Sequence, residues 1–481
     1  MGDRVVVVGA GVGGLAVAIR LAVAGRRVVL LERNEVTGGK LASVRHDGFA
    51  YDTGPSLLTL PHVFDELFRL AGTSLDSELD LVRLATQFRY RWPDGSELAV
   101  PDDPVARVEA FEAFAPGAGP AWRQFDELGR RVWEVSERTF LAGPMAGPLS
   151  LARRMRSPSD LLAIDPLRSL HRCAAAHFDD PRLVQWAGRY ATYSGSSPFR
   201  APATLACIQH IESRHGCWYP RGGVDELRRA LQRLAESLGV EVRTGTDVVA
   251  ITTAGDAVSG VELADGSTVA SPVVVANADA EHVYRDLLPD SAALRRLRRA
   301  RRSTSGLIVL VAATGTTPGI DHHNVWFSAD DRAEFAALDA GRMADDPTIY
   351  ACVSSVSDRT QAPEGCENWF LLVNTPPGIL LDHDRERVRV LDVLADRGVD
   401  LRARARWSDV ITPLDMAGRY RAPAGAIYGT SSNGRRSAFL RPGNRGARRG
   451  LYLVGGSSHP GGGLPLVAIG ARIVADLVTC D

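Results

Sequence analysis

A cluster of glycines near the amino terminus has the type and spacing needed to hold a phosphate. Gly9, Gly11 and Gly14 fit the pattern G-x-G-x-x-G, and Gly13 is a further glycine inside it. The first glycine of this pattern permits a tight turn, the second lets the backbone approach a pyrophosphate, and the third allows a helix to pack closely on a strand. The free N–H groups at the start of that helix would face the anion.

The segments around this turn are those that a dinucleotide site needs. The β-branched run Arg4–Val8 is too short for a helix and predicts a buried parallel strand. A helix over Leu15–Ala24 and a second strand over Val28–Leu31 would complete a βαβ unit. Glu32 closes that strand 18 residues after Gly14, where its carboxylate could accept hydrogen bonds from ribose hydroxyls. The same carboxylate would repel a 2′-phosphate, which disfavours NADP.

Three further segments favour FAD over NAD. Gly39 and Lys40 form a G-G-K step, which in flavoproteins with two dinucleotide-type domains brings a cation near FAD. Gly54 and Pro55 lie in a tight turn that can bring backbone amides near a flavin, and Val248 follows a helix–strand unit at the place where such proteins contact adenine. The chain contains one strand–glycine–helix unit, so a separate nicotinamide site is not evident.

A second glycine-rich turn follows the last predicted strand, Leu451–Val454. Gly455 and Gly456 would let backbone N–H groups approach the flavin end of FAD, although a plain strand–helix turn is the alternative. Pro465 and Leu466 begin the closing helix.

The composition excludes several other functions. The 481 residues carry a net charge of -1, which gives no reason to expect a nucleic-acid partner. The six cysteines form no C-x-x-C pair, so we expect neither a metal site nor a disulfide framework, and a reducing cytosol fits best. We expect no signal peptide and no membrane span.

The distribution of these elements predicts an α/β fold with a discontinuous, Rossmann-like FAD-binding domain. That domain would comprise residues 1–75, 215–280 and 430–481. An α+β substrate domain, made of residues 76–214 and 281–429, would be inserted into it in two pieces, with a helical lid that contacts the membrane.

Together these motifs resemble the bacterial phytoene desaturase-like carotenoid desaturases, within the amine-oxidase-type flavoproteins. The resemblance covers essentially the whole chain, and its form looks closest to the desaturases of hydroxylated acyclic carotenoids. The similar blocks are GAGVGGL, LLERNEVTGGK and GFAYDTGPSLLTLP within Gly9–Pro61, YATYSGSSPFRAPAT at Tyr190–Thr204, WYPRGGVDEL at Trp218–Leu227, and GLYLVGGSSHPGGGLPLV at Gly450–Val467.

The resemblance implies an FAD enzyme that removes a hydride from an allylic carbon of a polyene and so introduces a C=C bond. It also implies that the helix start at Pro465 and Leu466 faces the flavin, that oxygen or a quinone takes up the electrons, and that the protein is cytoplasmic and attached peripherally to the inner face of the cell membrane. The alternatives on the same scaffold are an oxygenase, isomerase or oxidase of another lipophilic polyene or isoprenoid, and a flavin-binding protein without catalysis.

The catalytic residues stay open at this stage. His459 could be a base or a structural residue, and Glu212 could stabilise a substrate cation or form a buried pair. Tyr190, Tyr193 and Phe199 could line an apolar tunnel or pack in the core. Residues 145–170 form a basic amphipathic stretch, which predicts either membrane contact or an ordinary lid.

Overall fold

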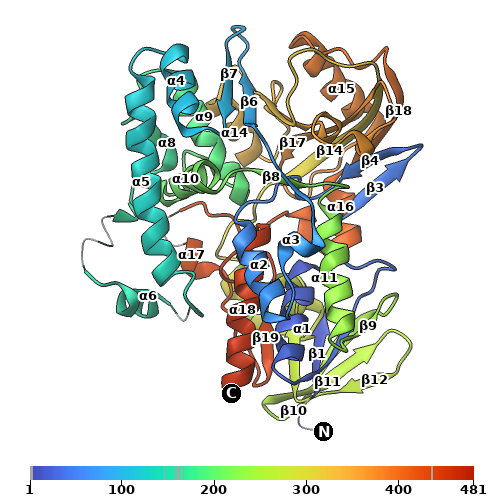
Figure 1. The fold of residues 1–481 in the computed structure, drawn as a ribbon. Coiled ribbons are helices and arrows are strands. Elements are labelled where there is room, and N and C mark those ends of the chain that lie inside the picture. The colour runs from blue at the N-terminus through green and yellow to red at the C-terminus, as the bar shows by residue number, and fades with distance from the viewer. Residues whose placement is uncertain (1–3, 146, 158–159, 161–162, 166, 435–436) are drawn as a thin grey trace.

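A five-stranded parallel sheet forms the base of the molecule (Figure 1). The computed structural model describes residues 4–145, 147–157, 160, 163–165, 167–434 and 437–481. In this sheet the strand order is β19-β13-β1-β2-β9, and every neighbouring pair is parallel. The strands are β1 (Arg4–Val8), β2 (Arg27–Leu31), β9 (Glu241–Arg243), β13 (Val273–Ala276) and β19 (Leu451–Leu453).

Apolar side chains bury both faces of this sheet, as a parallel sheet requires. Helices α1 (Val12–Val23), α11 (Asp225–Ser237) and α18 (Leu464–Cys480) pack on one face. The antiparallel sheet of β10 (Val248–Ala254), β11 (Ala257–Leu263) and β12 (Thr268–Ala270) packs on the other. The carboxyl ends of β1, β13 and β19 therefore meet at one edge, where a ligand would bind.

A seven-stranded, mostly antiparallel sheet stands above that edge, in the order β18-β14-β17-β16-β15-β6-β7 (Figure 1). Only β15 and β6 pair in parallel. Its strands are β6 (Thr86–Arg91), β7 (Glu97–Pro101), β14 (Ser305–Thr314), β15 (His323–Trp326), β16 (Ile349–Cys352), β17 (Cys366–Thr375) and β18 (Ala405–Ile411). The long strands β14 and β17 pair along their whole length and carry much of a second apolar core.

Helices and short elements connect and cover the two large sheets. The helices are α2 (Pro61–Leu70), α3 (Leu75–Glu78), α4 (Pro104–Phe114), α5 (Ala118–Thr139), α6 (Pro148–Arg154), α8 (Leu170–Ala174), α9 (Pro181–Gly188), α10 (Ala206–His215), α12 (Ala280–His282), α13 (Ser291–Leu297), α14 (Asp331–Asp339), α15 (His383–Asp396), α16 (Pro413–Tyr420) and α17 (Ser437–Leu440). The short strands are β3 (Ser43–His46), β4 (Phe49–Asp52), β5 (Leu81–Arg83) and β8 (Trp218–Pro220). The short helical turns are η1 (Arg189–Ser194), η2 (Ala203–Leu205), η3 (Val283–Leu287), η4 (Ser354–Val356), η5 (Arg359–Gln361) and η6 (Pro423–Gly425).

The structure confirms the mixed α/β class and the predicted βαβ unit. It differs at two helix starts: α1 begins at Val12 rather than Leu15, and α18 begins at Leu464. Glycine has a low helix propensity, so the sequence pattern placed the start of α1 after Gly13 and Gly14, whereas packing against neighbouring backbone keeps both inside the first turn. Among the helices of the described ranges, none combines the length and the apolar run that a membrane crossing requires.

Candidate functional site

One cavity of about 530 Å³ runs from the first βαβ unit to the seven-stranded sheet. At one end it is lined by Glu32 and Val248, in its middle by the two glycine-rich turns, and at the other end by side chains of the upper sheet such as Phe370. Of the predicted cofactor-binding residues, Gly9, Gly11, Gly13, Glu32, Gly39, Lys40, Gly54, Pro55, Val248, Gly455, Gly456 and Pro465 line this cavity. Gly14 and Leu466 do not.

The amino-terminal turn is packed so closely that its glycines have no room for a side chain. A Cβ on Gly14 would lie 2.0 Å from the carbonyl oxygen of Gly9, and one on Gly9 would lie 2.5 Å from that of Asn277. Gly9 also has a φ of +93°, which side chains of L-residues rarely allow. Gly14 therefore shapes the site by packing helix on strand, which is the role of the third glycine.

Asn277 is a site residue that the sequence reasoning missed. It follows β13 and donates from Nδ2 to the carbonyl oxygen of Gly9 over 3.0 Å. Its Oδ1 would lie 2.7 Å from a Cβ on either Gly13 or Gly455. The side chain thus joins the two glycine-rich turns. Its place at the carboxyl end of a parallel strand was the available signal, because ligands bind at that edge.

The G-G-K step and the Gly54 turn form the adjoining wall. The N–H of Gly38 donates to the carbonyl oxygen of Ala10 over 2.7 Å, which places this step against the first turn. A Cβ on Gly54 would lie only 1.8 Å from the carbonyl oxygen of Lys40. At Gly38 and Gly54, therefore, the backbone packs so closely that a larger residue would displace the neighbouring segments.

Glu32 is buried at the far end of the cavity and already has protein partners. Its Oε2 accepts from the N–H of Ala10 over 2.9 Å, and its Oε1 accepts from the backbone and side chain of Asn34 over 2.9 and 2.8 Å. A carboxylate has about four acceptor positions, so capacity is left for a ligand hydroxyl. Glu32 thus both fixes the first turn and presents an acceptor to the cavity.

Two helices begin at the cavity. The turn before α1 and the turn before α18 both line it, the latter through Gly463, Leu464 and Pro465. Helix starts carry free N–H groups and a partial positive charge, which favour an anionic or electron-rich ligand. Leu466 turns away and packs with Ile469 and its neighbours instead.

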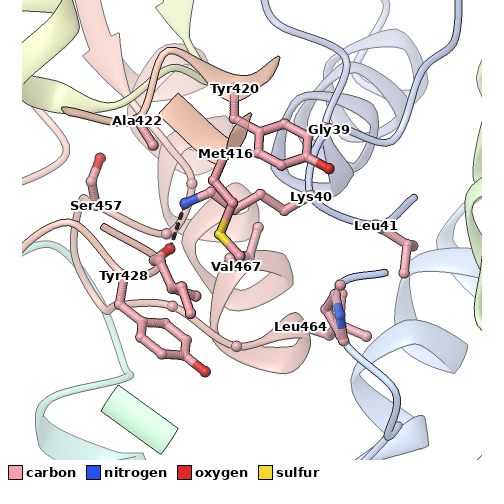
Figure 2. Close-up of a pocket in the computed structure, with 18 of the residues that line it drawn as sticks. Gly39, Lys40, Leu41, Met416, Tyr420, Ala422, Tyr428, Ser457, Leu464 and Val467 are labelled. Carbon is pink, nitrogen blue, oxygen red and sulfur yellow. Dashed lines mark hydrogen bonds between the residues drawn. The ribbon is translucent and has the colours of Figure 1, made fainter. Parts of the chain in front are cut away.

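Lys40 is a half-buried cation on the cavity wall (Figure 2). Its Nζ donates to the carbonyl oxygen of Ile427 and, over 3.4 Å, to that of Ala426. Burial lowers the pKa of Lys40, and the nearby carboxylate of Asp279 opposes this. Figure 2 shows the hydrogen bond of the Lys40 side chain as a dashed line, on the side of the cavity where Tyr428 lies. The cation therefore ties the 426–427 segment to the cofactor side of the cavity.

Asp279 is a second lining residue that the sequence reasoning did not name. It caps α12 by accepting from the N–H of Glu281 over 2.9 Å. Burial raises the pKa of Asp279, and Lys40 opposes that shift. The two groups thus place opposite charges near Ser457, whose Oγ accepts from the N–H of Ala280 over 2.9 Å.

These features fit a dinucleotide with a flavin. The glycine positions form a cradle that a Cβ would fill, two helix starts face it, and an acceptor carboxylate lies at one end. An extended ligand could lie along the cavity from Glu32 to the Gly455 turn.

The part of the cavity beside the upper sheet is mainly apolar. Side chains from six of its strands line it: Phe88, Val325, Tyr350, Phe370, Leu372, Ile308 and Ile411. The hydroxyl of Tyr350 is bonded to Ser56 over 2.6 Å and to His323 over 2.8 Å, so it is satisfied within the protein. This part can hold a long apolar molecule that reaches the cofactor side.

Both weak catalytic candidates lie outside the cavity lining. His459 is buried, its Nε2 lies 3.2 Å from the carbonyl oxygen of Gly143, and its ring packs edge-on against Phe140. Burial lowers the pKa of His459 to about 4, so it is neutral at pH 7. Glu212 accepts from the hydroxyls of Tyr190 and Tyr193 and stands behind the cavity wall. These contacts favour the structural alternatives.

The three aromatic residues proposed for a tunnel have different positions. Tyr193 lines the cavity, Tyr190 lies behind it, and Phe199 packs between His171 and Phe335. Only Tyr193 therefore meets a ligand in this cavity directly.

A buried group of possible metal ligands was not anticipated from the cysteine spacing. His322, His323 and Cys352 bring three ligand atoms within 4.8 Å of one another behind Tyr350. Burial lowers the pKa of His322 to about 3 and that of His323 well below its usual value, so both imidazoles are neutral. The grouping arises because Cys352 and His323 are register partners on β16 and β15.

Comparisons with known proteins place these features in context. The family described as flavin containing amine oxidoreductase matches residues 12–389. A hydroxyneurosporene desaturase from Cereibacter sphaeroides is 37% identical over 99% of this chain and 98% of its own. A 4,4'-diapolycopene oxygenase from a Methylomonas species is 33% identical over 100% of this chain and 98% of its own. The solved structure of putrescine oxidase bound to putrescine has 15% identity and a TM-score of 0.66 over 100% of this chain and 99% of its own, which shows a shared fold.

Proposed function

The chain belongs to the flavin-containing amine oxidoreductase family, and from this membership we propose that it desaturates acyclic carotenoids. It is an FAD-dependent oxidoreductase. When bound, FAD would take up both hydrogen atoms: a hydride would leave an allylic carbon, a proton would leave the neighbouring carbon, FAD would become FADH2, and the new C=C bond would join the conjugation. We propose oxygen or a quinone as the final electron acceptor.

The residues that would hold the cofactor follow from the cavity wall. The Gly9–Gly14 turn would face the pyrophosphate, Glu32 would accept from the ribose, and backbone at Val248 would contact the adenine. Gly39, Lys40, Gly54, Pro55, Gly455, Gly456 and Pro465 would enclose the flavin end. Residues 1–75, 215–280 and 430–481 would form this FAD unit, and residues 76–214 and 281–429 the substrate unit.

The observation that supports the proposal most is the continuity of the cavity. The glycine-lined part opens directly into the apolar part beside the upper sheet, so a polyene lying there would reach the flavin end without crossing water. The apolar side chains would align the chain and exclude water, while the protein need not supply a strong base, because loss of the hydride makes the neighbouring C–H acidic.

The test is turnover of purified, FAD-loaded protein with acyclic carotenoids in detergent or vesicles. Chromatography and mass spectrometry should show loss of two hydrogen atoms, and the absorption spectrum should move to longer wavelength. If lycopene, neurosporene and their hydroxylated forms are all returned unchanged in the presence of oxygen and a quinone, the proposal is wrong.

An oxygenase is the second candidate, because a relative at 33% identity over nearly its full length is named a 4,4'-diapolycopene oxygenase. The same experiment separates the two reactions. Desaturation gives a product that only loses two hydrogen atoms. A product that contains ¹⁸O from ¹⁸O₂ would instead identify the reaction as oxygenation.

Peripheral contact with the inner face of the cell membrane also belongs to the proposal, since the substrate dissolves there. A second pocket is lined by four arginines, Arg168, Arg172, Arg200 and Arg301, and lies beside Leu167, whose side chain is 66% exposed. Arg168 is ion-paired with Asp165, and Arg200 and Arg301 share Asp339, so Arg172 is the arginine best placed to attract an anionic headgroup, and the exposed leucine can enter the interface. Part of the predicted basic stretch 145–170 lies outside the described residues.

Vesicle flotation tests this contact. We expect binding to vesicles containing phosphatidylglycerol that weakens with salt, and weaker binding when Arg172 and Leu167 are replaced by Gln and Ser. Equal recovery from anionic and neutral vesicles would argue against an electrostatic attachment at this pocket.

A further inference from the structure

An arginine stands in the apolar part of the cavity. Arg189 opens the short helix η1 and lines the cavity. Its Cζ lies 4.1 Å from the centre of the Phe88 ring and 5.1 Å from that of Tyr193, and both rings also line the cavity. A charge in such apolar surroundings is costly unless protein groups compensate it. Its presence therefore needs an explanation.

Protein groups hold this cation in place without pairing it directly with a carboxylate. Its Nη1 donates to the hydroxyl of Tyr90 and its Nη2 to that of Tyr193, each over 2.9 Å. Tyr193 in turn donates to Oε1 of Glu212, and Tyr190 donates to Oε2 over 3.1 Å. The carboxylate of Glu212 is thus reached through a tyrosine. Burial opposes the charge of Arg189, but the tyrosine and Glu212 oxygens raise its pKa well above the usual value, so it stays charged.

Arg189 keeps hydrogen-bonding capacity that its polar neighbours lack. A guanidinium has five N–H donors, and two of them serve the tyrosines. Gln185 also lines the cavity, but it donates to the carbonyl of Ser328 and accepts from Trp92, each over 2.9 Å. Glu334 accepts three bonds from Ser328 and Thr348. Of these three polar side chains, Arg189 is therefore the donor best able to bind a ligand oxygen.

We propose that Arg189, oriented by Tyr193, binds an oxygen atom carried by the polyene and so selects oxygenated acyclic polyenes over hydrocarbons of the same length. This rests on the proposed function and names its specificity-determining residue. A neutral acceptor such as a hydroxyl oxygen fits this donor, because the carboxylate of Glu212 lies two hydrogen bonds away, through Tyr193, and offsets the guanidinium charge. A hydrocarbon bound at the same place would cover the N–H groups and leave them unpaired, which is how a polar site rejects an apolar analogue.

The experiment compares Arg189→Met with the native protein, both loaded with FAD, on a pair of substrates. One is an acyclic polyene with a tertiary hydroxyl near its end, and the other is the hydrocarbon of equal length and conjugation. We expect kcat/KM for the hydroxylated polyene to fall about 10- to 100-fold, the range for a hydrogen bond to a charged group. The value for the hydrocarbon should stay within about threefold or rise. Arg189→Lys should recover part of the preference.

Equilibrium binding gives a readout that does not depend on turnover. Tryptophan quenching by each polyene should show the same loss of preference in Arg189→Met, while FAD affinity is unchanged. Arg182→Gln in α9 is the control, because this arginine stacks on Phe114 at 4.6 Å and does not line the cavity. Its substrate preference should match that of the native protein.

The outcomes separate the inference from the function on which it rests. If the native protein converts neither polyene, the proposed function fails. If it converts both with equal kcat/KM, or if Arg189→Met loses activity on both to the same extent, the function stands and the assignment of Arg189 is wrong. Tyr193→Phe provides a second test if Arg189→Met fails to fold, because it keeps the ring and removes only the hydroxyl that orients Arg189. This variant should also reduce the preference for the hydroxylated polyene over the hydrocarbon.

Discussion

Replacing Gly14 by alanine should weaken FAD binding more than it lowers the stability of the fold. The added Cβ would lie 2.0 Å from the carbonyl oxygen of Gly9 and 3.1 Å from Nδ2 of Asn277. Ordinary contact begins near 3.4 Å, so α1 and the first turn must separate by about 1.4 Å. Both groups that obstruct the new Cβ belong to the site: the carbonyl oxygen of Gly9 is part of its backbone, and Nδ2 of Asn277 is part of a side chain. Overpacking of this kind costs about 1–3 kcal/mol, and the better helix propensity of alanine returns about 1 kcal/mol.

The effect on FAD should exceed the effect on stability. A displacement of more than 1 Å removes at least one hydrogen bond from the turn's N–H groups to a charged phosphate, worth about 1.5–3 kcal/mol, so the Kd of FAD should rise about 10- to 100-fold. Flavin fluorescence titration of apoprotein measures this, with denaturant midpoints recorded alongside.

Gly418→Ala is the matched control for Gly14→Ala. Gly418 lies within helix α16, and a Cβ there would meet nothing within 4 Å. This variant should gain about 1 kcal/mol of helix propensity and bind FAD normally. The reasoning would be refuted if Gly14→Ala bound FAD as tightly as Gly418→Ala.

Three further predictions follow from single contacts. Glu32→Gln should raise the Kd of FAD about tenfold, because an amide nitrogen cannot accept from the N–H of Ala10. Glu241→Gln is the control, since Glu241 is exposed at the start of β9, and it should leave the Kd unchanged. Equal Kd values for the two variants would count against the role of Glu32. Lys40→Met should weaken FAD binding by a similar factor, since it removes the bonds to the 426–427 carbonyls; full affinity would contradict this. His459→Gln should leave the pH profile of turnover unchanged, because the His459 ring does not line the cavity. The same variant should reduce the loss of unfolding free energy that the native protein shows as the pH falls. The folded-state pKa of about 4 lies below the unfolded value of about 6.5, so the unfolded state binds more protons between them and native stability falls by up to ~3 kcal/mol as pH drops through that window; urea midpoints from pH 7 to 4 with the same slope in both proteins would disprove it.

The glycine-rich lining of the cavity could be predicted from the sequence, because local spacing constrains the backbone there. Gly9, Gly11 and Glu32 are fixed by a turn, a helix start and a strand end that lie close together in the sequence, and local spacing therefore determines their geometry. The same local reasoning applies to the second turn at Gly455, which follows a predicted strand. The same reasoning missed Asn277, because its role depends on the strand order β13-β1, which no local pattern specifies.

The substrate side could not be predicted in this way, because its residues meet only through long-range sheet pairing. Phe88 and Tyr350 come from strands far apart in the sequence, and neither carries a motif. Apolar side chains at such positions look like any core residue. The two catalytic candidates were chosen for chemical type, but His459 and Glu212 both serve as buried partners of other groups.

Arg189 illustrates what sequence alone could not weigh. In the chain it is one arginine among many, next to tyrosines that could equally pack in the core. Its role is inferred from the cost of a charge in apolar surroundings and from the two tyrosine partners, which engage only part of its donor capacity beside the cavity. In an FAD enzyme whose chemistry belongs mostly to the cofactor, selection among polyenes that differ by one oxygen has to come from such a group, because apolar walls distinguish a hydroxyl from a hydrogen only weakly.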